Sequence, residues 1–477
     1  MEPLEALKNS SFGKRTAEEE FDQLKNYFVE TDQWKQVIDG TVDVVYGPKG
    51  SGKSAIYSLI SQNGELLKEK NILVVQGENP QGTPAFKILI DDMPVDQFEF
   101  ISIWKLYVLS LCGQAIKING ISNKKCLDCI SILEEANLIP SDPSLSKALK
   151  YAFDYVKSLT RIQAIESELK IDPITGMPTG IAGRIVLREP GAAASKVGVR
   201  SVDDLFKSMS DALKDAGYTI WITLDRLDVA FQNNEKLENA ALRALFQFYL
   251  ETKSNNNIKT KIFLRSDIWK SISASGFREA SHIERSLNIE WNNETLVNLF
   301  VRRAVANKSI CDYFKIVPDE ILSNFASQQA FIGSIFPQQV DSGPNKPKTF
   351  DWILSRTKDG TQPNAPRELI HFLNELRTVQ IARLERGEKT LPAGKLFDQV
   401  AFKEALPNVS KVRLEQTLFA EYPDIKQHVE AMRDCLESRR LVFRWAGECD
   451  SHYGCGHMRT GAGWPRSPRR RSAIPAT

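Results

Sequence analysis

One short segment constrains the fold of this chain more than any other feature. It runs from Gly47 to Ser54, reads GPKGSGKS and fits the pattern G-x-x-x-x-G-K-[ST]. The preceding run TVDVVY (residues 41–46) is rich in β-branched and aromatic residues, which predicts a buried strand ending at a tight turn. A glycine-rich turn between a strand and a helix indicates a phosphate-binding loop, the P-loop. The alternative, a glycine-rich turn with a chance lysine, is disfavoured because every fixed position matches.

Each fixed position of the loop has a chemical reason. Glycines allow the backbone to turn its N–H groups inward around phosphate oxygens, in conformations that a Cβ would obstruct. We expect Lys53 to place its charge on the β- and γ-phosphates, Ser54 to offer its hydroxyl to Mg²⁺, and the following helix to add its positive end. The predicted cofactors are ATP and Mg²⁺. The predicted binding residues are Gly47, Pro48, Lys49, Gly50, Ser51, Gly52, Lys53, Ser54 and Ala55.

Further apolar, β-prone runs follow along the chain, and polar residues end each of them. Strands are predicted at 71–75 (NILVV), 218–224 (YTIWITL) and 261–264 (KIFL), and helices at 17–29, 98–111 and 202–216. Strands that alternate with helices predict an α/β fold with a parallel sheet. The ligand site of such a sheet lies at the carboxyl ends of its strands.

A metal-side carboxylate is expected at the end of YTIWITL. Asp225 follows this run directly and fits the Walker-B aspartate, which orients Mg²⁺ through water, although a turn aspartate is the alternative. Many hydrolytic P-loop proteins carry an acid directly after this aspartate, but Arg226 occupies the place here. Asp228 is therefore the predicted catalytic base, with a helix cap or an ion pair to Arg226 as the alternatives.

Two arginines are predicted to contact the phosphates. Arg265 follows the strand KIFL, where a polar residue can touch the γ-phosphate or the attacking water; a salt bridge to Asp267 or Glu284 is the alternative. Arg367, in NAPRELI, lies in the first turn of a predicted helix, from which it can reach back to the phosphates. The alternative for Arg367 is a solvated position at the helix start.

Composition limits the class of protein. No apolar run approaches the roughly 18–20 residues that span a bilayer, and residues 1–14 lack the apolar centre of a signal peptide, so a cytoplasmic protein without a membrane partner is expected. The net charge of +2 gives no argument for nucleic acid. Seven scattered cysteines fit a reducing compartment, and the lone CxxC of Cys126 and Cys129 is interpreted as two buried thiols.

The chain is too long for one domain, because domains average roughly 150 residues. The predicted divisions are N-terminal helices leading into the core (1–40), a P-loop core (41–290) with a helical insertion at about 112–195, a helical lid domain (291–386), a partial winged-helix-like module (387–440) and a tail (441–477). Lysine is absent after Lys426, while Arg, Gly, Trp, Cys and Pro become common. The tail is therefore predicted to be aberrant or disordered, and its Cys449, His452, Cys455 and His457 are discounted as metal ligands.

The segments GPKGSGKSA, ITLDRLD, IFLRSD, IEWNNETLVNLFVRR and NAPRELIHFLN, in this order, resemble bacterial P-loop ATPases of the group that contains the STAND and KAP NTPases. The resemblance covers about residues 11–410 and is strongest to an uncharacterised prokaryotic family with a DRLD-type Walker B. KAP members share a Pro-Arg helix followed by Asn, matched here by Pro366, Arg367 and Asn374. This chain lacks their membrane helices and their paired aspartates.

The resemblance implies an ATP-driven conformational switch, in defence against phage or in a genome-related process, with a protein partner or effector and with oligomerisation left open. A P-loop kinase is disfavoured by the extra strand between the P-loop and Walker-B segments and by the long helical lid. A nucleotide-binding scaffold that hydrolyses nothing is the other alternative, and Arg226 is the reason to consider it.

Overall fold

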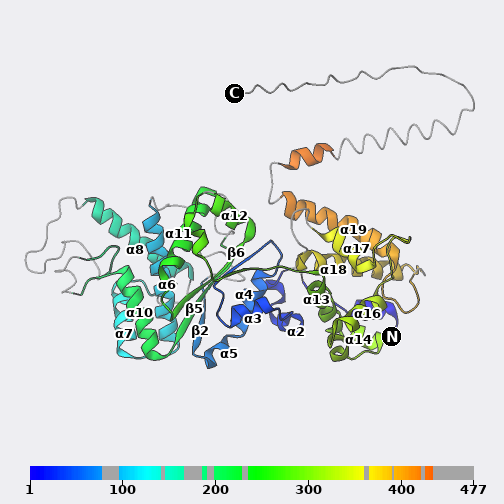
Figure 1. Ribbon diagram of the computed structural model, residues 1–477, viewed down its shortest axis with the longest axis horizontal. Helices are drawn as coiled ribbons and strands as arrows, with labels where there is room; N and C mark the ends of the chain where they lie inside the picture. The colour runs from blue at the N-terminus through cyan, green and yellow to red at the C-terminus, as the bar shows by residue number, and fades with distance from the viewer. Residues whose placement is uncertain are drawn as a thin grey trace, which may run out of the picture. The chain divides into compact units, whose positions relative to one another are not determined.

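Five strands form the central sheet of the protein (Figure 1). In the order β2-β5-β6-β1-β7, every neighbouring pair is parallel. The predicted α/β fold with a parallel sheet is therefore confirmed. Sequence reasoning missed only β7 among these strands, because its three residues carry no apolar run. The strands are β1 (Val44–Gly47), β2 (Ile72–Gln76), β5 (Thr219–Leu224), β6 (Ile258–Arg265) and β7 (Ser286–Asn288).

The computed structural model describes residues 1–14, 16–77, 96–140, 145–165, 185–190, 198–227, 235–274, 276–358, 365–388, 391–419 and 425–432. The chain divides into two compact units, Met1–Val409 and Ser410–Thr477. In the second unit, the described residues hold the end of α19 (Gln399–Arg413), a π-helical turn (Leu414–Leu418) and a helix at 426–432. The predicted tail at 441–477 lies outside the described residues.

The two faces of the sheet are buried by different helices. On one face, Tyr46, Ile222 and Leu264 pack against α6, α11 and α12. On the other face, Trp221 and Phe263 pack with α3 and α4. Side chains of one strand alternate between the two faces, and each face carries apolar residues, so the strands read as continuous apolar runs. The helices around the sheet are α3 (Asp32–Ile38), α4 (Lys53–Gln62), α5 (Gly64–Glu69), α6 (Gln97–Ile118), α10 (Val202–Ala216), α11 (Glu235–Thr252), α12 (Ser266–Ala274) and the 3₁₀ helix η5 (Arg278–His282).

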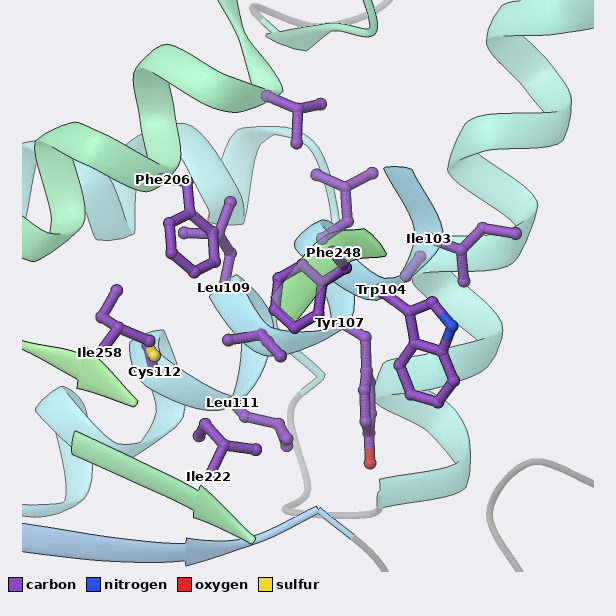
Figure 2. Packing of buried hydrophobic residues seen from close by; sticks show 14 of the residues in the cluster. Ile103, Trp104, Tyr107, Leu109, Leu111, Cys112, Phe206, Ile222, Phe248 and Ile258 are labelled. Carbon is purple, nitrogen blue, oxygen red and sulfur yellow. The ribbon is translucent and has the colours of Figure 1, made fainter. Parts of the chain in front are cut away.

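Helix α6 is the centre of the larger core. Figure 2 shows Leu109, Leu111 and Cys112 of this helix among side chains of the sheet and of α10 and α11. The helix runs for 22 residues, beyond the predicted end at residue 111, and by length and composition it could cross a membrane. However, 83% of its apolar window is buried inside the protein. Its apolar surface is thus already covered by protein, as in the central helix of a water-soluble domain.

The region predicted as a helical insertion contributes helices α7 (Lys124–Glu135) and α8 (Leu145–Ile165), both packed on α6. It also holds the two-residue strand β3 (Ile185–Val186), which pairs in parallel with β4 (Arg200–Ser201) just after the region; the sequence predicted neither strand. Helix α10 follows with the predicted bounds. Ser201 caps it by accepting a hydrogen bond from the Asp204 backbone N–H, and Gly217 ends it in a left-handed conformation.

A separate hydrophobic core is made mostly by helices, which we call the helical body. Its residues come from α1, from the segment after α1 and from the chain after β7, and Phe300, Phe336 and Phe402 lie near its centre. Helix α1, which the sequence assigned to the leading segment 1–40, packs here on α14 and α18. The helices are α1 (Pro3–Lys8), α13 (Asn293–Val305), α14 (Lys308–Phe314), α15 (Pro318–Leu322), α16 (Phe325–Ile335), α17 (Thr349–Thr357), α18 (Pro366–Glu385) and α19.

Helix α19 falls in the region predicted to be a partial winged-helix-like module, 387–440. Its Phe402, Ala405 and Val409 belong to the core of the helical body. Only helix and turn occur in the described residues of this region, and the β-hairpin of a winged helix is not seen among them. The winged-helix interpretation stays a prediction.

A buried charge cluster joins β1 and β6 on the α4 side of the sheet. Lys261 is 1% exposed, its Nζ donates to Asp43 Oδ1 at 2.9 Å and to the carbonyl of Val42, and it lies 4.4 Å from the Trp221 ring centroid. The Asp43 carboxylate also pairs with Arg285 Nε at 2.6 Å. Burial outweighs the attraction of Asp43 and lowers the pKa of Lys261 to about 8.

This lowered pKa predicts a specific pH dependence of stability. Between pH 8 and 10.5 the folded protein loses the Lys261 proton while the unfolded chain still binds it, so stability rises with pH in this window. Lys261→Met removes that contribution and leaves Asp43 paired with Arg285. The difference in unfolding free energy, wild type minus variant, should grow by about 2 kcal/mol from about pH 7.5 to about pH 10 in urea denaturation. A difference that stays constant with pH would show that Lys261 titrates normally.

Candidate functional site

The predicted phosphate loop connects β1 to α4. Strand β1 ends at Gly47 and α4 begins at Lys53, as the motif requires. Gly50 and Gly52 have φ angles of +79° and +100°, in the left-handed region that glycine adopts without strain. Lys53 is 8% exposed, and its Nζ donates to the carbonyls of Gly47 at 2.9 Å and Pro48 at 3.0 Å. The loop therefore curls around its lysine at the start of a helix, where backbone N–H groups favour anions.

A cavity of about 290 Å³ opens beside this loop. Lys49, Gly50, Ser51, Gly52, Lys53, Ser54 and Ala55 line it, together with Asp225, Arg265 and Arg367. Gly47 and Pro48 contribute carbonyls to Lys53 and are not among the lining residues. The cavity thus brings together predicted residues that are more than 300 positions apart in the chain.

Asp225 and Ser54 are the predicted metal-side residues, and both line the cavity. Asp225 directly follows β5 and is 4% exposed. A hydroxyl and a carboxylate are hard oxygen donors of the kind that Mg²⁺ accepts beside phosphate oxygens and water. In the part of the chain that the structure describes, no group of three or more His, Cys, Asp or Glu side chains is placed to hold a metal ion.

Arg265 ends β6, and Gly47 of β1 is its partner in the sheet register. Its Nη2 lies 2.5 Å from Asp267 Oδ2, and its Nε donates to Asp267 Oδ1 at 3.1 Å. Burial opposes ionisation of Asp267, but Arg265 holds the pKa of this carboxyl below its usual value. The predicted salt bridge to Asp267 is therefore present, and the arginine lines the cavity as well.

Arg367 lies in the first turn of α18, as predicted, and touches the phosphate loop directly. Its backbone N–H donates to the Gly50 carbonyl over 3.4 Å. A Cβ built on Gly50 would lie 2.8 Å from Arg367 Cβ, closer than real contacts allow. The helical body therefore meets the loop at a position where only glycine fits.

Asp228, the predicted base, lies outside the described residues, as do Asn364 and the tail residues Cys449, His452, Cys455 and His457. Cys126 and Cys129 are buried on α7, which confirms the interpretation as buried thiols. Burial raises the pKa of Cys129 to about 11, so a thiolate for metal or redox chemistry is disfavoured.

Sequence reasoning missed the segment that leads from α1 to α3, described at residues 9–14 and 16–31, which we call the N-terminal strap. Lys14, Thr16, Glu20, Phe28 and Thr31 of this strap line the cavity. It includes the 3₁₀ helix η1 (Glu18–Gln23) and α2 (Leu24–Tyr27). The apolar spacing in 17–29 predicted one helix, and the structure has two short ones there, η1 and α2. No periodicity in the sequence indicates that this segment lines a cavity.

A buried ion pair fastens the strap to the helical body. Arg303 of α13 is 5% exposed, and its Nη1 and Nη2 contact the two oxygens of Glu20 at 2.9 and 2.8 Å. The Arg303 guanidinium also lies over the Tyr27 ring at 4.5 Å. Burial, with the charge of Glu20, raises the pKa of Tyr27 to about 12, so its hydroxyl remains a donor. The edge of the guanidinium binds Glu20 and one face lies over Tyr27, so one arginine contacts both η1 and α2 of the strap.

Trp291 is the second connection. It stands between β7 and α13, and its ring packs against both the helical body and the core around α4. Its indole N–H donates to the carbonyl of Ser51 at 2.8 Å, and the residue lines the cavity. The chain segment that enters the helical body is thereby hydrogen-bonded to the phosphate loop.

The cavity is strongly basic. The lining includes seven basic residues (Lys14, Lys49, Lys53, Arg226, Arg265, Arg303 and Arg367) and two acidic ones, Glu20 and Asp225. Glu20 is engaged by Arg303, which leaves a large surplus of positive charge toward a ligand. Such a site suits a polyanion.

Comparison of the chain with protein-family models, with curated proteins and with solved structures finds no match.

The close approach of Arg367 to the loop predicts unequal effects of two alanine substitutions. Gly50→Ala places a Cβ against Arg367 in a left-handed backbone, whereas Gly52→Ala has the same backbone conformation with no atom within 4 Å of the added Cβ. Each substitution should cost about 1–2 kcal/mol for the backbone, and Gly50→Ala about 1–3 kcal/mol more for the contact. Urea denaturation of both variants measures the difference. Equal losses would mean that the helical body does not press on the loop in solution.

Proposed function

We propose that this protein binds Mg·ATP in the cavity beside the phosphate loop and acts as an ATP-driven conformational switch. The observation that carries the proposal is the single cavity lined by the loop, by Asp225 and Arg265 at the ends of two strands, and by Arg367 of the helical body. The contacts in such a site depend on the number of phosphates in the ligand. A change in these contacts can shift the position of the helical body, whose residue Arg367 lines the cavity.

The two parts of the cavity support a nucleotide rather than inorganic phosphate. The loop, the start of α4 and the basic side chains suit the phosphate chain. Beside them, Phe28, Val29, Ile289 and Trp291 supply an apolar and aromatic part of the lining. An aromatic base has a flat apolar surface that such side chains can cover.

Magnesium fits the donor atoms of Ser54 and Asp225. When bound, Mg²⁺ neutralises part of the charge that develops on phosphate oxygens. The contribution of the chain itself is to hold Asp225 buried at the end of β5 and to present the Ser54 hydroxyl from the first turn of α4.

A P-loop kinase is less well supported. In the sheet, strand β6 lies between β1, which leads into the loop, and β5, which ends before Asp225. The N-terminal strap, α13 and α18, which are parts of this chain, line the cavity. This lining favours control of the helical body over phosphate transfer to a second small substrate.

A scaffold that binds ATP without hydrolysing it remains the second candidate, because Arg226 follows Asp225 and lines the cavity. Arginine cannot accept a proton from water. Single-turnover hydrolysis at saturating Mg·ATP separates the two candidates, since it measures chemistry alone.

The same proposal has three further parts. The protein belongs to the STAND and KAP group, it lies in the cytoplasm, and it has a protein or nucleic-acid partner in phage defence or a genome-related process. They rest on the sequence motifs and on the covered apolar surface of α6. A switch also requires an effector, which copurification with the full chain would identify.

Lys53→Ala tests binding. Loss of the charge should weaken Mg·ATP affinity by about 1.5–3 kcal/mol, the range for a charge-assisted contact. Titration calorimetry measures the change, and Lys68→Ala, an exposed lysine of α5, is the matched control. Equal affinities of wild type and Lys53→Ala would contradict the assignment of the loop.

Asp225→Asn tests the metal side. The amide keeps the size of the side chain but removes the charge. Mg²⁺-dependent turnover should therefore fall by about 10–100-fold, as for ligand-orienting residues at metal sites. The hydrogen bonds from backbone N–H groups of the loop to phosphate should remain. Turnover across a Mg²⁺ titration is the measurement. Wild-type turnover at every Mg²⁺ concentration would remove Asp225 from the metal side.

A further inference from the structure

Arg226 has an unusual backbone conformation for its position. Among the described residues, four besides glycine have positive φ angles: Asn71, Asn137, Arg226 and Lys315. Asparagine tolerates this region, and Lys315 ends helix α14 in the left-handed form common at helix ends. Arg226, with φ of 57°, is instead the second residue after a buried strand. Such a conformation costs an arginine about 1–2 kcal/mol and persists where the surroundings fix it, often at functional sites.

The left-handed residue reverses the alternation of side chains at the end of β5. Ile220, Ile222 and Leu224 face the core around α6, so a regular continuation would point the next even residue, Arg226, into that apolar core. Instead Leu227 joins this core and is 1% exposed, while Arg226 lines the cavity. The turn at residue 226 thus puts Leu227 into the core in place of Arg226. It leaves the charge of Arg226 in the cavity beside Asp225.

The sheet register gives the level of the end of β5 relative to the loop. Leu224, the last residue of β5, is paired with Ile262 of β6, which is paired with Val44 of β1. The end of β5 therefore lies three residues short of Gly47, and Arg226 is two residues beyond that end and lines the same cavity as the loop.

We infer that Arg226 binds the terminal phosphate of the nucleotide and makes the cavity selective for a nucleoside triphosphate over a diphosphate. A metal held by Ser54 and Asp225 would lie beside the β- and γ-phosphates. A cation one residue beyond the metal-side carboxylate is then placed for the γ-phosphate, whose charged oxygens the planar guanidinium of arginine can contact in pairs. This inference rests on the proposed function, and it assigns Arg226 to recognition of the phosphate chain.

The test compares two variants that carry the same substitution in the same backbone conformation. Arg226→Asn removes the charge and keeps a side chain that tolerates positive φ, so the fold is retained. Lys315→Asn does the same at an exposed helix end with φ of 54°. Calorimetric titrations with Mg·ADP and with a non-hydrolysable β,γ-imido analogue of ATP, on the full chain, avoid interference from hydrolysis.

For Arg226→Asn, affinity for the triphosphate analogue should fall by about 10–100-fold, the loss expected for a charge-assisted contact, while ADP affinity changes by less than about twofold. Lys315→Asn should bind both ligands as the wild type does. Arg226→Lys, which keeps a charge without the planar fork, should recover part of the loss.

Equal changes for the two nucleotides, or no change, would overturn the role of Arg226 while leaving nucleotide binding intact. A wild-type protein that binds neither nucleotide would overturn the proposed function together with this inference. Thermal denaturation of each variant confirms that a lost affinity reflects the site rather than unfolding.

Discussion

Burial of the sheet on both faces is the constraint on which the rest of this structure depends. Trp221 and Phe263 fill one face, and Ile222 and Leu264 fill the other, so the strand interiors have almost no room for polar side chains. Thr223 and Thr260 are buried there, and Lys261 is the buried charged side chain among the described strand residues; its partners are a carboxylate, a carbonyl and an aromatic ring. Polar groups that act on a ligand must therefore lie where the strands end. Because the strands are parallel, those ends meet at one edge of the sheet.

Much of the α/β part could be predicted because its signals are local. Apolar runs marked β2, β5 and β6, and the predicted helix at 202–216 has the bounds of α10. The two-residue strands β3 and β4 and the short β7 escaped prediction, since their pairing comes from neighbours rather than from their own residues.

Residues of the candidate site were predictable only where they lie at the end of a predicted strand or at the start of a predicted helix. The loop, Asp225, Arg265 and Arg367 each stand at such a boundary, and the structure brings all of them to one cavity. The N-terminal strap gave no comparable signal. Its contribution depends on long-range bonds, such as Glu20 to Arg303, that join residues 283 positions apart.

The chain passes between the sheet and the helical body by two routes, the N-terminal strap and the segment at Trp291, and both routes line the cavity. A body attached at one point can swivel in any direction, whereas attachment at two points restricts its easiest motion to rotation about the line between them. The bonds of Arg303 and Trp291 sit on these two routes. Arg367 adds a third contact at the loop itself, where its backbone N–H donates to the carbonyl of Gly50. All three contacts involve residues that line the cavity, so a rotation about the line between the two routes would change the spacing of the cavity walls.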